Sequence, residues 1–269
     1  MTKIKDNCIL ITGGASGIGR IMGRMALEKG ARQLVIWDIN EQNIAATEAA
    51  LSPLGKVKGY KVNVADHAAV EQAFRTTTEE CGDVDILINC AGIVTSNKTF
   101  DEQSLSDIER TMAINATAPM VVALQALPPM IKRDKGHICN IASAAGMISN
   151  PRMSVYAASK WAVIGWSDSV RIELQERKSN VHFTTVAPYY INTGMFDGVR
   201  SRFFPILDPE RTARKILRAI ERNTDFRGIP WSSHFFRLCQ GLLPVSWFDT
   251  IVGRWLGIYS TMDHFTGRK

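Results

Sequence analysis

Short runs of apolar, β-branched residues alternate along the chain with longer segments whose apolar residues recur at helical spacing. A strand buried on both faces shows a continuous apolar run, and a helix packed on it shows the longer period. The runs predict strands at 8–12, 33–37, 56–64, 86–89, 136–141 and 181–186. The helical pattern predicts helices at 20–29, about 41–51, 68–81, from 104 past 119, 156–174 and 209–223. Strands that alternate with helices indicate an α/β fold.

The composition limits the number of domains. The chain has 269 residues, of which 45% are apolar and 22% charged. That suits one large α/β domain or two small domains. No repeat, low-complexity tract or polar linker divides the sequence, and we therefore predict a single domain over residues 1–269.

Cysteine use and the chain's apolar stretches bear on its compartment. The five cysteines are odd in number and scattered, with neither a disulfide framework nor a metal-ligand spacing. We expect no bound metal and a reducing, cytoplasmic environment. The two lysines near the N-terminus precede no apolar h-region, and so we expect no signal peptide. The longest apolar candidate for a membrane span, 118–131, is interrupted by Gln125 and two prolines.

The net charge of +6 is placed unevenly. Residues 200–269 hold 12 Lys and Arg against 6 Asp and Glu, whereas residues 1–199 hold 20 of each. A basic end suits nucleic acid or an anionic lipid surface. No nucleic-acid motif accompanies it, and we expect no nucleic-acid partner.

A glycine-rich turn, GGASGIG at 13–19, separates the first predicted strand from the first predicted helix. This arrangement binds a dinucleotide pyrophosphate, because glycines let the backbone approach the phosphates and the helix N-terminus offers N–H groups. An ordinary glycine-rich turn is the alternative. The residues expected to contact the cofactor here are Gly13, Ser16, Gly17, Ile18 and Gly19.

Asp38 ends the second predicted strand, nineteen residues after Gly19. A carboxylate at about this spacing hydrogen-bonds the adenosine ribose 2′-hydroxyl and would repel a 2′-phosphate. No Arg or Lys follows at 39–41. We therefore expect NAD rather than NADP, with a strand-end turn residue or a helix N-cap as the alternative role for Asp38.

Tyr156 and Lys160 lie four residues apart, with Ser143 thirteen residues before Tyr156. On a helix, this spacing puts both side chains on one face. A nearby ammonium would lower the phenol pKa from its ordinary ~10 and make Tyr156 a useful general acid or base. Ser143 would donate a hydrogen bond to a substrate oxygen. A Tyr and a Lys at this spacing also occur on solvated helix faces, so the assignment depends on the other motifs.

TGGASGIG at 12–19 and Y-x-x-x-K at 156–160 together resemble the short-chain dehydrogenase/reductase family. The segment 89–92 resembles its NNAG motif, with Cys90 in place of the second Asn, and 188–193 resembles its Pro-Gly loop, with Tyr189 in place of Gly. The likeness covers about residues 6–194. It implies a Rossmann-type doubly wound parallel sheet of about seven strands with helices on both faces.

The same resemblance implies roles for four catalytic residues. Tyr156 would exchange a proton with the substrate oxygen, Ser143 would position that oxygen, and Lys160 would lower the pKa of Tyr156 and bind the nicotinamide ribose. Asn115 would distort its helix and hold a water that relays protons to Lys160; a buried, satisfied Asn is the alternative. The further cofactor contacts implied are Asn63, in place of the usual acid, Val64, Asn89, Ala91, Gly92, Tyr156, Lys160, Pro188, Ile191 and Thr193.

The last third of the chain is expected to govern substrate and location. Residues 194–207 are rich in Met, Phe and Leu, and with the helix at 209–223 we expect 194–228 to form an apolar substrate lid and closing helix. Residues 229–269 would form an apolar and basic C-terminal extension. Its three tryptophans and two isolated arginines suit a membrane interface, or a tail packed on its own subunit or dimer partner.

The segments TGMFDGVRSRF, LDPERTARKILRAI and LGIYSTMDHFTGR resemble the branch that contains retinol dehydrogenases and 17β-hydroxysteroid dehydrogenases. Members of that branch usually begin with a hydrophobic anchor that this sequence lacks, and we expect a soluble or peripherally bound protein. The expected activity is NAD-dependent interconversion of a hydrophobic alcohol (retinoid, steroid, long-chain or bulky aryl) and its aldehyde or ketone in lipid metabolism, by a homodimer or homotetramer. A non-catalytic NAD(H)-sensing protein and a nucleotide-sugar epimerase or dehydratase are the alternatives.

Overall fold

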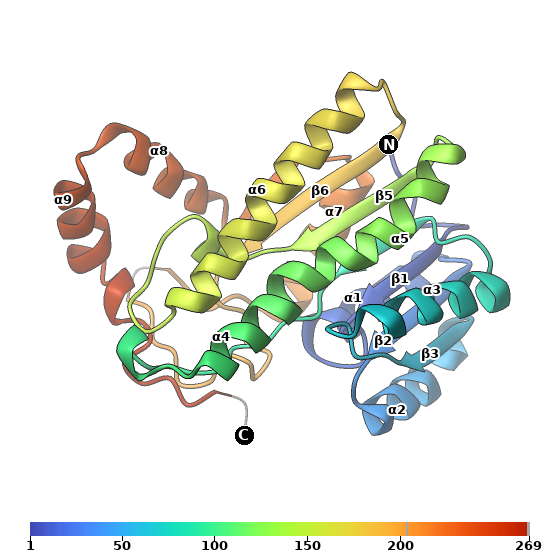
Figure 1. The fold of residues 1–269 in the computed structure, drawn as a ribbon, viewed down its shortest axis with the longest axis horizontal. Helices are drawn as coiled ribbons and strands as arrows, with labels where there is room; N and C mark the ends of the chain where they lie inside the picture. Colours follow the sequence, from blue (N-terminus) through green and yellow to red (C-terminus); the bar gives the residue numbers. More distant parts are fainter. Residues whose placement is uncertain (203, 268–269) are drawn as a thin grey trace.

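Seven parallel strands form one sheet at the centre of the molecule (Figure 1). The computed structural model describes residues 1–202 and 204–267. The strand order is β3-β2-β1-β4-β5-β6-β7, so the direction of winding reverses between β1 and β4. The strands are β1 (Cys8–Thr12), β2 (Gln33–Asp38), β3 (Val57–Lys61), β4 (Ile86–Asn89), β5 (Gly136–Ile141), β6 (Val181–Pro188) and β7 (Phe226–Ile229).

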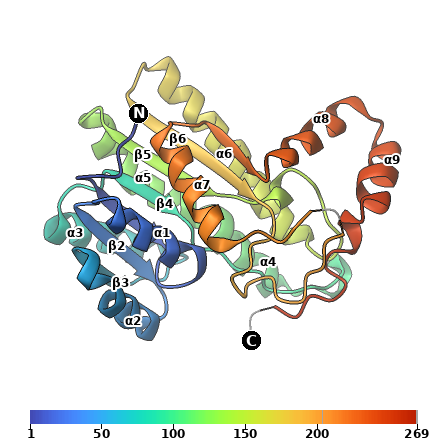
Figure 2. The same cartoon turned by 180° about the vertical axis from the view of Figure 1, so that it is seen from behind.

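Helices cover both faces of this sheet (Figures 1 and 2). One face carries α1 (Gly17–Glu28), α2 (Glu41–Leu51) and α7 (Pro209–Glu221); the other carries α3 (His67–Cys81), α5 (Ala118–Lys132) and α6 (Ser154–Glu176). Successive strand residues point to opposite faces: Ile9 and Ile11 belong to one buried cluster, Cys8 and Leu10 to the other. Both faces are therefore apolar, and the expected doubly wound fold is confirmed.

The predicted elements agree with the structure within a few residues, except for the third strand. The pattern predicted 56–64, but β3 ends at Lys61. After it, the side chain of Asp66 accepts a hydrogen bond from the N–H of Ala69 at 3.1 Å and caps α3. The sequence pattern did not locate β7, because a four-residue strand that contains an arginine and a glycine has no apolar run.

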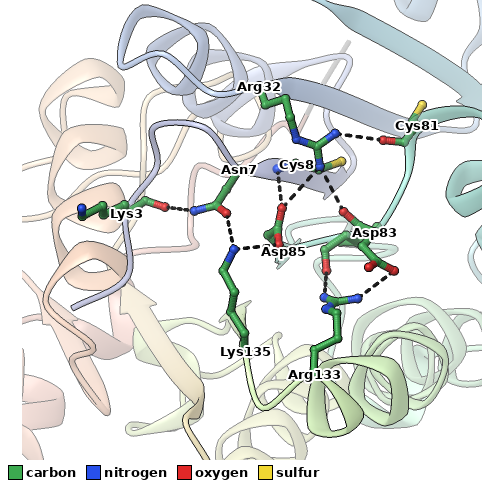
Figure 3. Close-up of polar contacts among 10 residues, drawn as sticks. Lys3, Asn7, Cys8, Arg32, Cys81, Asp83, Asp85, Arg133 and Lys135 are labelled. Carbon is green, nitrogen blue, oxygen red and sulfur yellow. Dashed lines mark hydrogen bonds and ion pairs between the residues drawn. The ribbon is translucent and has the colours of Figure 1, made fainter.

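A polar network at the amino ends of the strands holds the sheet together (Figure 3). Asp85, which precedes β4, accepts a hydrogen bond from the N–H of Cys8 at 2.9 Å and forms ion pairs with Arg32 at 3.5 Å and Lys135 at 3.3 Å. These residues lie at the starts of β1, β2 and β5. The network fixes these strands at their amino ends. The carboxyl ends of the strands lie outside it.

The helix predicted at 209–223 is present as α7, Pro209–Glu221. Asp208 caps α7 by accepting a hydrogen bond from the N–H of Arg211 at 2.7 Å, and Pro209 occupies its first position. The buried side of α7, with Ile216 and Ile220, packs toward α1. Ion pairs from α1 to Glu210 and from Lys29 to Glu221 border this contact.

Two short helices, α8 (His234–Leu242) and α9 (Val245–Phe248), follow β7 and project from the body of the molecule (Figures 1 and 2). A π-helical turn (Asp249–Trp255) leads back to it. Residue 203 of the predicted lid and residues 268–269 of the predicted extension lie outside the described residues.

One continuous helix among the described residues, Leu105–Lys132, is long and apolar enough to cross a membrane by length and composition alone. It comprises α4 (Leu105–Met112), a π-helical turn (Ala113–Thr117) and α5. The core helix of a soluble protein passes the same test, and α5 packs against α3, β4 and β5. This helix is therefore weak evidence for a membrane span.

Candidate active site

A cavity of about 300 Å³ lies at the carboxyl ends of the central strands, where the winding of the sheet reverses. Open α/β sheets bind ligands at this position. Most of the predicted site residues line it: Gly13, Ser16, Gly17, Ile18, Gly19, Asp38, Asn63, Val64, Ala91, Gly92, Ser143, Tyr156, Lys160, Pro188, Ile191 and Thr193.

Tyr156 and Lys160 reach the cavity from the first turns of α6, and Ser143 reaches it from the end of β5. The Lys160 ammonium lies 5.7 Å from the centroid of the Tyr156 ring and donates a hydrogen bond to the carbonyl of Ile141 at 3.1 Å. The Ser143 hydroxyl accepts a hydrogen bond from the N–H of Ala145 at 3.1 Å, which holds its side chain. The three predicted side chains therefore converge on one space.

Burial shifts the two titrating groups in opposite directions. It raises the pKa of Tyr156, and a hydrogen bond with Ser143 opposes that rise. It lowers the pKa of Lys160 to about 8, with Cys90 opposing. The expected lowering of the Tyr156 pKa is not present, because burial removes the phenolate from water and raises this pKa.

Asn115 lies behind the cavity wall, fully buried in the π-helical turn between α4 and α5. Its side-chain oxygen accepts a hydrogen bond from the N–H of Ile93 at 2.8 Å, and its amide donates to the carbonyl of Ile93 at 2.8 Å and to Ser159 at 3.3 Å. The expected helix distortion is present. The alternative of a satisfied, buried Asn describes the side chain equally well, and the two descriptions are compatible.

The glycine-rich turn packs closely against its own backbone neighbours at positions where a larger residue would not fit. Gly13 has φ +66°, and a Cβ there would lie 2.9 Å from the backbone of Ala91; a Cβ on Gly19 would lie 2.3 Å from the carbonyl oxygen of Gly13. Thr12 fixes the neighbouring turn, because its hydroxyl accepts hydrogen bonds from the N–H groups of Cys90 at 3.0 Å and Ala91 at 3.2 Å. The cradle is thus preformed around the amino end of α1.

Asp38 is held at the cavity edge. Its carboxylate accepts hydrogen bonds from the N–H of Ala15 at 3.2 Å and of Asn40 at 3.1 Å. Asn40, rather than Asp38, caps α2 through the N–H of Asn43. The N-cap alternative for Asp38 is therefore wrong.

Asn89 is the one predicted cofactor residue that lies clearly beneath the cavity wall. It is 3% exposed, and its amide donates to Asn140 at 2.9 Å and to the carbonyl of Pro119 at 3.2 Å. It therefore supports the floor of the site. Cys90 lines the cavity instead, and burial raises its pKa to about 12, so its thiol stays neutral.

The predicted lid contributes two side chains to the cavity, Met195 and Phe196. The Phe196 ring meets that of Tyr156 edge to face, with centroids 5.9 Å apart. Sequence reasoning predicted an apolar lid without identifying these residues. The other lining residues that it missed are Trp37, Ile39, Val62, Cys90, Ile93, Arg110, Ile114, Ile141, Ala142 and Tyr189.

The family model described as short chain dehydrogenase matches residues 7–202. The chain belongs to the short-chain dehydrogenase/reductase family. It is therefore an alcohol dehydrogenase/reductase of a family that binds NAD(P).

Two curated relatives of this dehydrogenase match nearly its whole length. It is 33% identical to epidermal retinol dehydrogenase 2 of Mus musculus, over 99% of this chain and 87% of that protein. It is also 33% identical to estradiol 17-beta-dehydrogenase 11 of Pongo abelii, over 90% of this chain and 81% of that protein.

A solved structure supports the fold of the dehydrogenase. A short-chain dehydrogenase/reductase from Burkholderia phymatum in complex with NAD has a TM-score of 0.77 and 24% identity, and the match covers 94% of this chain and 97% of that one. At that identity the likeness concerns the fold alone.

Proposed function

We propose that this dehydrogenase uses NAD to interconvert a hydrophobic alcohol and its aldehyde or ketone, with Tyr156 as general acid and base. The observation that carries the proposal is the convergence of Tyr156, Lys160 and Ser143 on one cavity whose remaining wall includes Met195 and Phe196. The nicotinamide cofactor, when bound, accepts or supplies the hydride.

In the oxidative direction, Tyr156 first gives up its proton, the hydroxyl proton of the alcohol then passes to its phenolate oxygen, and a carbonyl forms as the carbon loses the hydride that a bound nicotinamide would accept. In reduction the proton returns from Tyr156 to the carbonyl oxygen. Ser143 donates a hydrogen bond to that oxygen and keeps it within reach. Lys160, with its pKa near 8, holds a positive charge near neutral pH that favours the phenolate when Tyr156 gives up its proton.

Asn115 is proposed to serve the same proton transfer from behind. Its two hydrogen bonds to Ile93 hold the backbone of the π-helical turn. The turn lies close to Lys160, because a Cβ on Gly92 would be 3.3 Å from the Asn115 side-chain oxygen and 3.7 Å from the Lys160 nitrogen. We propose that the opened turn holds the water through which Lys160 exchanges protons with solvent.

The preference for NAD over NADP is proposed from Asp38. Its carboxylate lines the cavity and is fixed by two backbone N–H groups. A 2′-phosphate beside it would meet a like charge, and no Arg or Lys stands at 39–41 to compensate.

The hydrophobic substrate class is proposed from the lid and from the relatives. Met195, Phe196 and Tyr189 contribute apolar surface to the cavity. Relatives that match almost the full chain are named as retinol and estradiol dehydrogenases. Retinoids, steroids, long-chain alcohols and bulky aryl alcohols are the classes to test.

We also propose that the enzyme is a cytoplasmic homodimer or homotetramer, peripheral at a membrane. Support for an oligomer comes from exposed large apolar side chains on two helices of one sheet face, Leu124 on α5 and Trp161 and Ile172 on α6. Light scattering after size-exclusion chromatography tests it: Leu124→Lys with Ile172→Lys should lower the particle mass. An unchanged mass would reject these helices as the interface.

The activity is tested by cofactor reduction with NAD and NADP in parallel. The substrates are retinol, a 17β-hydroxysteroid, decanol, a bulky aryl alcohol and a small polar alcohol. Tyr156→Phe should abolish turnover, whereas Tyr60→Phe, which removes a surface hydroxyl, should leave it unchanged. Turnover of only the small polar alcohol would reject the hydrophobic substrate class; cofactor binding without turnover of any substrate would favour a sensor.

A further inference from the structure

The described part of the C-terminal extension divides into two regions, of which one packs on the lid and the other projects from the body. Residues 258–267 pack on the lid: the N–H of Arg200 donates to the carbonyl of Thr261 at 3.2 Å, and the N–H of Thr266 donates to that of Asp197 at 2.8 Å. Residues 231–255, here called the arm, comprise α8, α9 and their flanking turns and project away (Figures 1 and 2).

The arm exposes many large apolar side chains. Among the described residues, seven of this kind lie between 231 and 255, each at least 55% exposed: Trp231, Phe235, Leu238, Leu242, Val245, Trp247 and Trp255. A concentration of this kind on one projecting element is unusual for a surface that faces only water.

Helix α8 is apolar on two neighbouring sides, one buried and one exposed. Phe236 and Cys239 are 1% and 9% exposed and belong to a buried cluster with Ile148 and Phe248. On the other side, Phe235, Leu238 and Leu242 follow helical spacing and are exposed. The inner side already holds the arm on the body, so the arm's own packing does not explain the outer side.

The charges around the arm favour an anionic occupant. Arg254 is exposed, and Asp249 is the single acidic residue in the sequence 230–256. Arg237 is also exposed but lies 4.0 Å from the Asp168 carboxylate and 4.8 Å from the centroid of the Phe226 ring, and so it faces the body. The Asp249 carboxylate accepts a hydrogen bond from the hydroxyl of Tyr259. Arginine can rest its stem on apolar surface while its head reaches lipid phosphates, and tryptophan concentrates at membrane interfaces.

We propose that the outer side of the arm docks on the surface of a lipid bilayer that contains anionic headgroups. Leu238, Leu242 and Trp247 enter the headgroup–acyl boundary, and Arg254 pairs with a headgroup phosphate. This assigns residues to the proposed membrane contact and does not depend on the hydride chemistry.

Two successive aromatic contacts connect the arm with the wall of the catalytic cavity. Phe236 on its inner side meets Phe204 of the lid with ring centroids 5.1 Å apart, and Phe204 meets Tyr189 at 5.7 Å. Tyr189 lines the cavity. An alcohol dissolved in the bilayer would therefore reach the lid without crossing the far side of the enzyme.

Vesicle flotation of the full chain, without cofactor or substrate, tests the docking. The wild type should float with phosphatidylglycerol vesicles, less with phosphatidylcholine vesicles, and less at high salt. Leu238→Gln/Leu242→Gln/Trp247→Gln should reduce the bound fraction more than ~10-fold, because the variant loses three apolar side chains that would leave water on binding. Leu54→Gln changes an exposed leucine near α2, on the other side of the molecule, and should bind normally.

A second variant separates charge from apolar contact. Arg254→Gln should weaken binding to phosphatidylglycerol and leave binding to phosphatidylcholine unchanged. Unchanged Tm and NAD binding in every variant would show that folding is intact. Equal flotation of the wild type and the triple variant would overturn the proposal. The proposal would also be overturned if the wild type bound no vesicle and the triple variant had a smaller particle mass than the wild type. The outer side would then join two copies of the chain.

Discussion

The side-chain amide of Asn150 donates a hydrogen bond to the phenol oxygen of Tyr190 at 3.0 Å. The same amide donates to the hydroxyl of Thr261 at 2.8 Å, and the two hydroxyls lie 3.1 Å apart. This buried network joins the segment before α6, the loop after β6 and the C-terminal extension. Tyr190 also packs on Phe196, whose ring meets that of Tyr156.

Removing the Tyr190 hydroxyl should loosen this junction. Tyr190→Phe leaves Asn150 and Thr261 with fewer buried partners and should lower the free energy of unfolding by about 1–2 kcal/mol. Without the hydrogen bonds of its hydroxyl, the ring at position 190 is held less firmly against Phe196. KM should therefore rise more than kcat falls. Urea unfolding and steady-state kinetics measure both, with Tyr60→Phe as the surface control. Wild-type stability in Tyr190→Phe would mean that the network contributes nothing.

The sequence was sufficient to predict much of the fold and the site, because these features depend on local chemistry. Buried strands require apolar runs, the turn at Gly13 requires a left-handed backbone, and Tyr156 and Lys160 need only one helix to share a face. These predictions depend on neighbours within a few residues.

Features that depend on distant segments were not predictable in the same way. The position of Asn89 is set by Asn140 and Pro119, from two other elements. The segment that carries Phe196 to Tyr156 is hydrogen-bonded to residues 258–267, which lie about sixty residues further along the chain. The rise in the Tyr156 pKa reflects burial by the whole cavity wall. The spacing of residues along the sequence does not report how deeply distant segments bury a side chain.

Asn115 is expected to link local backbone geometry to catalysis. Asn115→Ala would leave the buried N–H and carbonyl of Ile93 without their side-chain partner, at a cost of about 2–4 kcal/mol for two groups. We expect kcat to fall at least ~10-fold, equivalent to about 1.4 kcal/mol in the barrier. Hydrogen exchange at the Ile93 amide should accelerate. Ser159→Ala retains both bonds to Ile93 and should preserve slow exchange there; equal exchange in Asn115→Ala and the wild type would contradict the assigned role.

Asp38 is expected to control the choice of cofactor. Asp38→Ala removes the charge that would oppose a 2′-phosphate, and the ratio of kcat/KM for NAD over NADP should fall at least ~10-fold. Asp66→Ala removes a carboxylate that caps α3 and should leave the ratio unchanged. Isothermal titration with both cofactors separates binding from turnover. A constant ratio in Asp38→Ala would rule out the ribose role.

His137 is expected to make the fold sensitive to acid. Its ring is fully buried between the hydroxyls of Thr2 at 2.9 Å and Thr184 at 2.8 Å, and burial, with His182 nearby, lowers its pKa to about 3. The unfolded chain takes up this proton near pH ~6.5, whereas the folded chain does not until about pH 3. The unfolded state therefore binds more protons between these values, and stability must fall as the pH falls through that window. From about pH 6.5 to pH 5 the free energy of unfolding should fall by about 2 kcal/mol.

His137→Gln, which cannot take up the proton, should show a shallower decline in urea unfolding, whereas the exposed control His67→Gln should follow the wild type. Parallel pH dependence in His137→Gln and the wild type would assign the acid sensitivity to other groups.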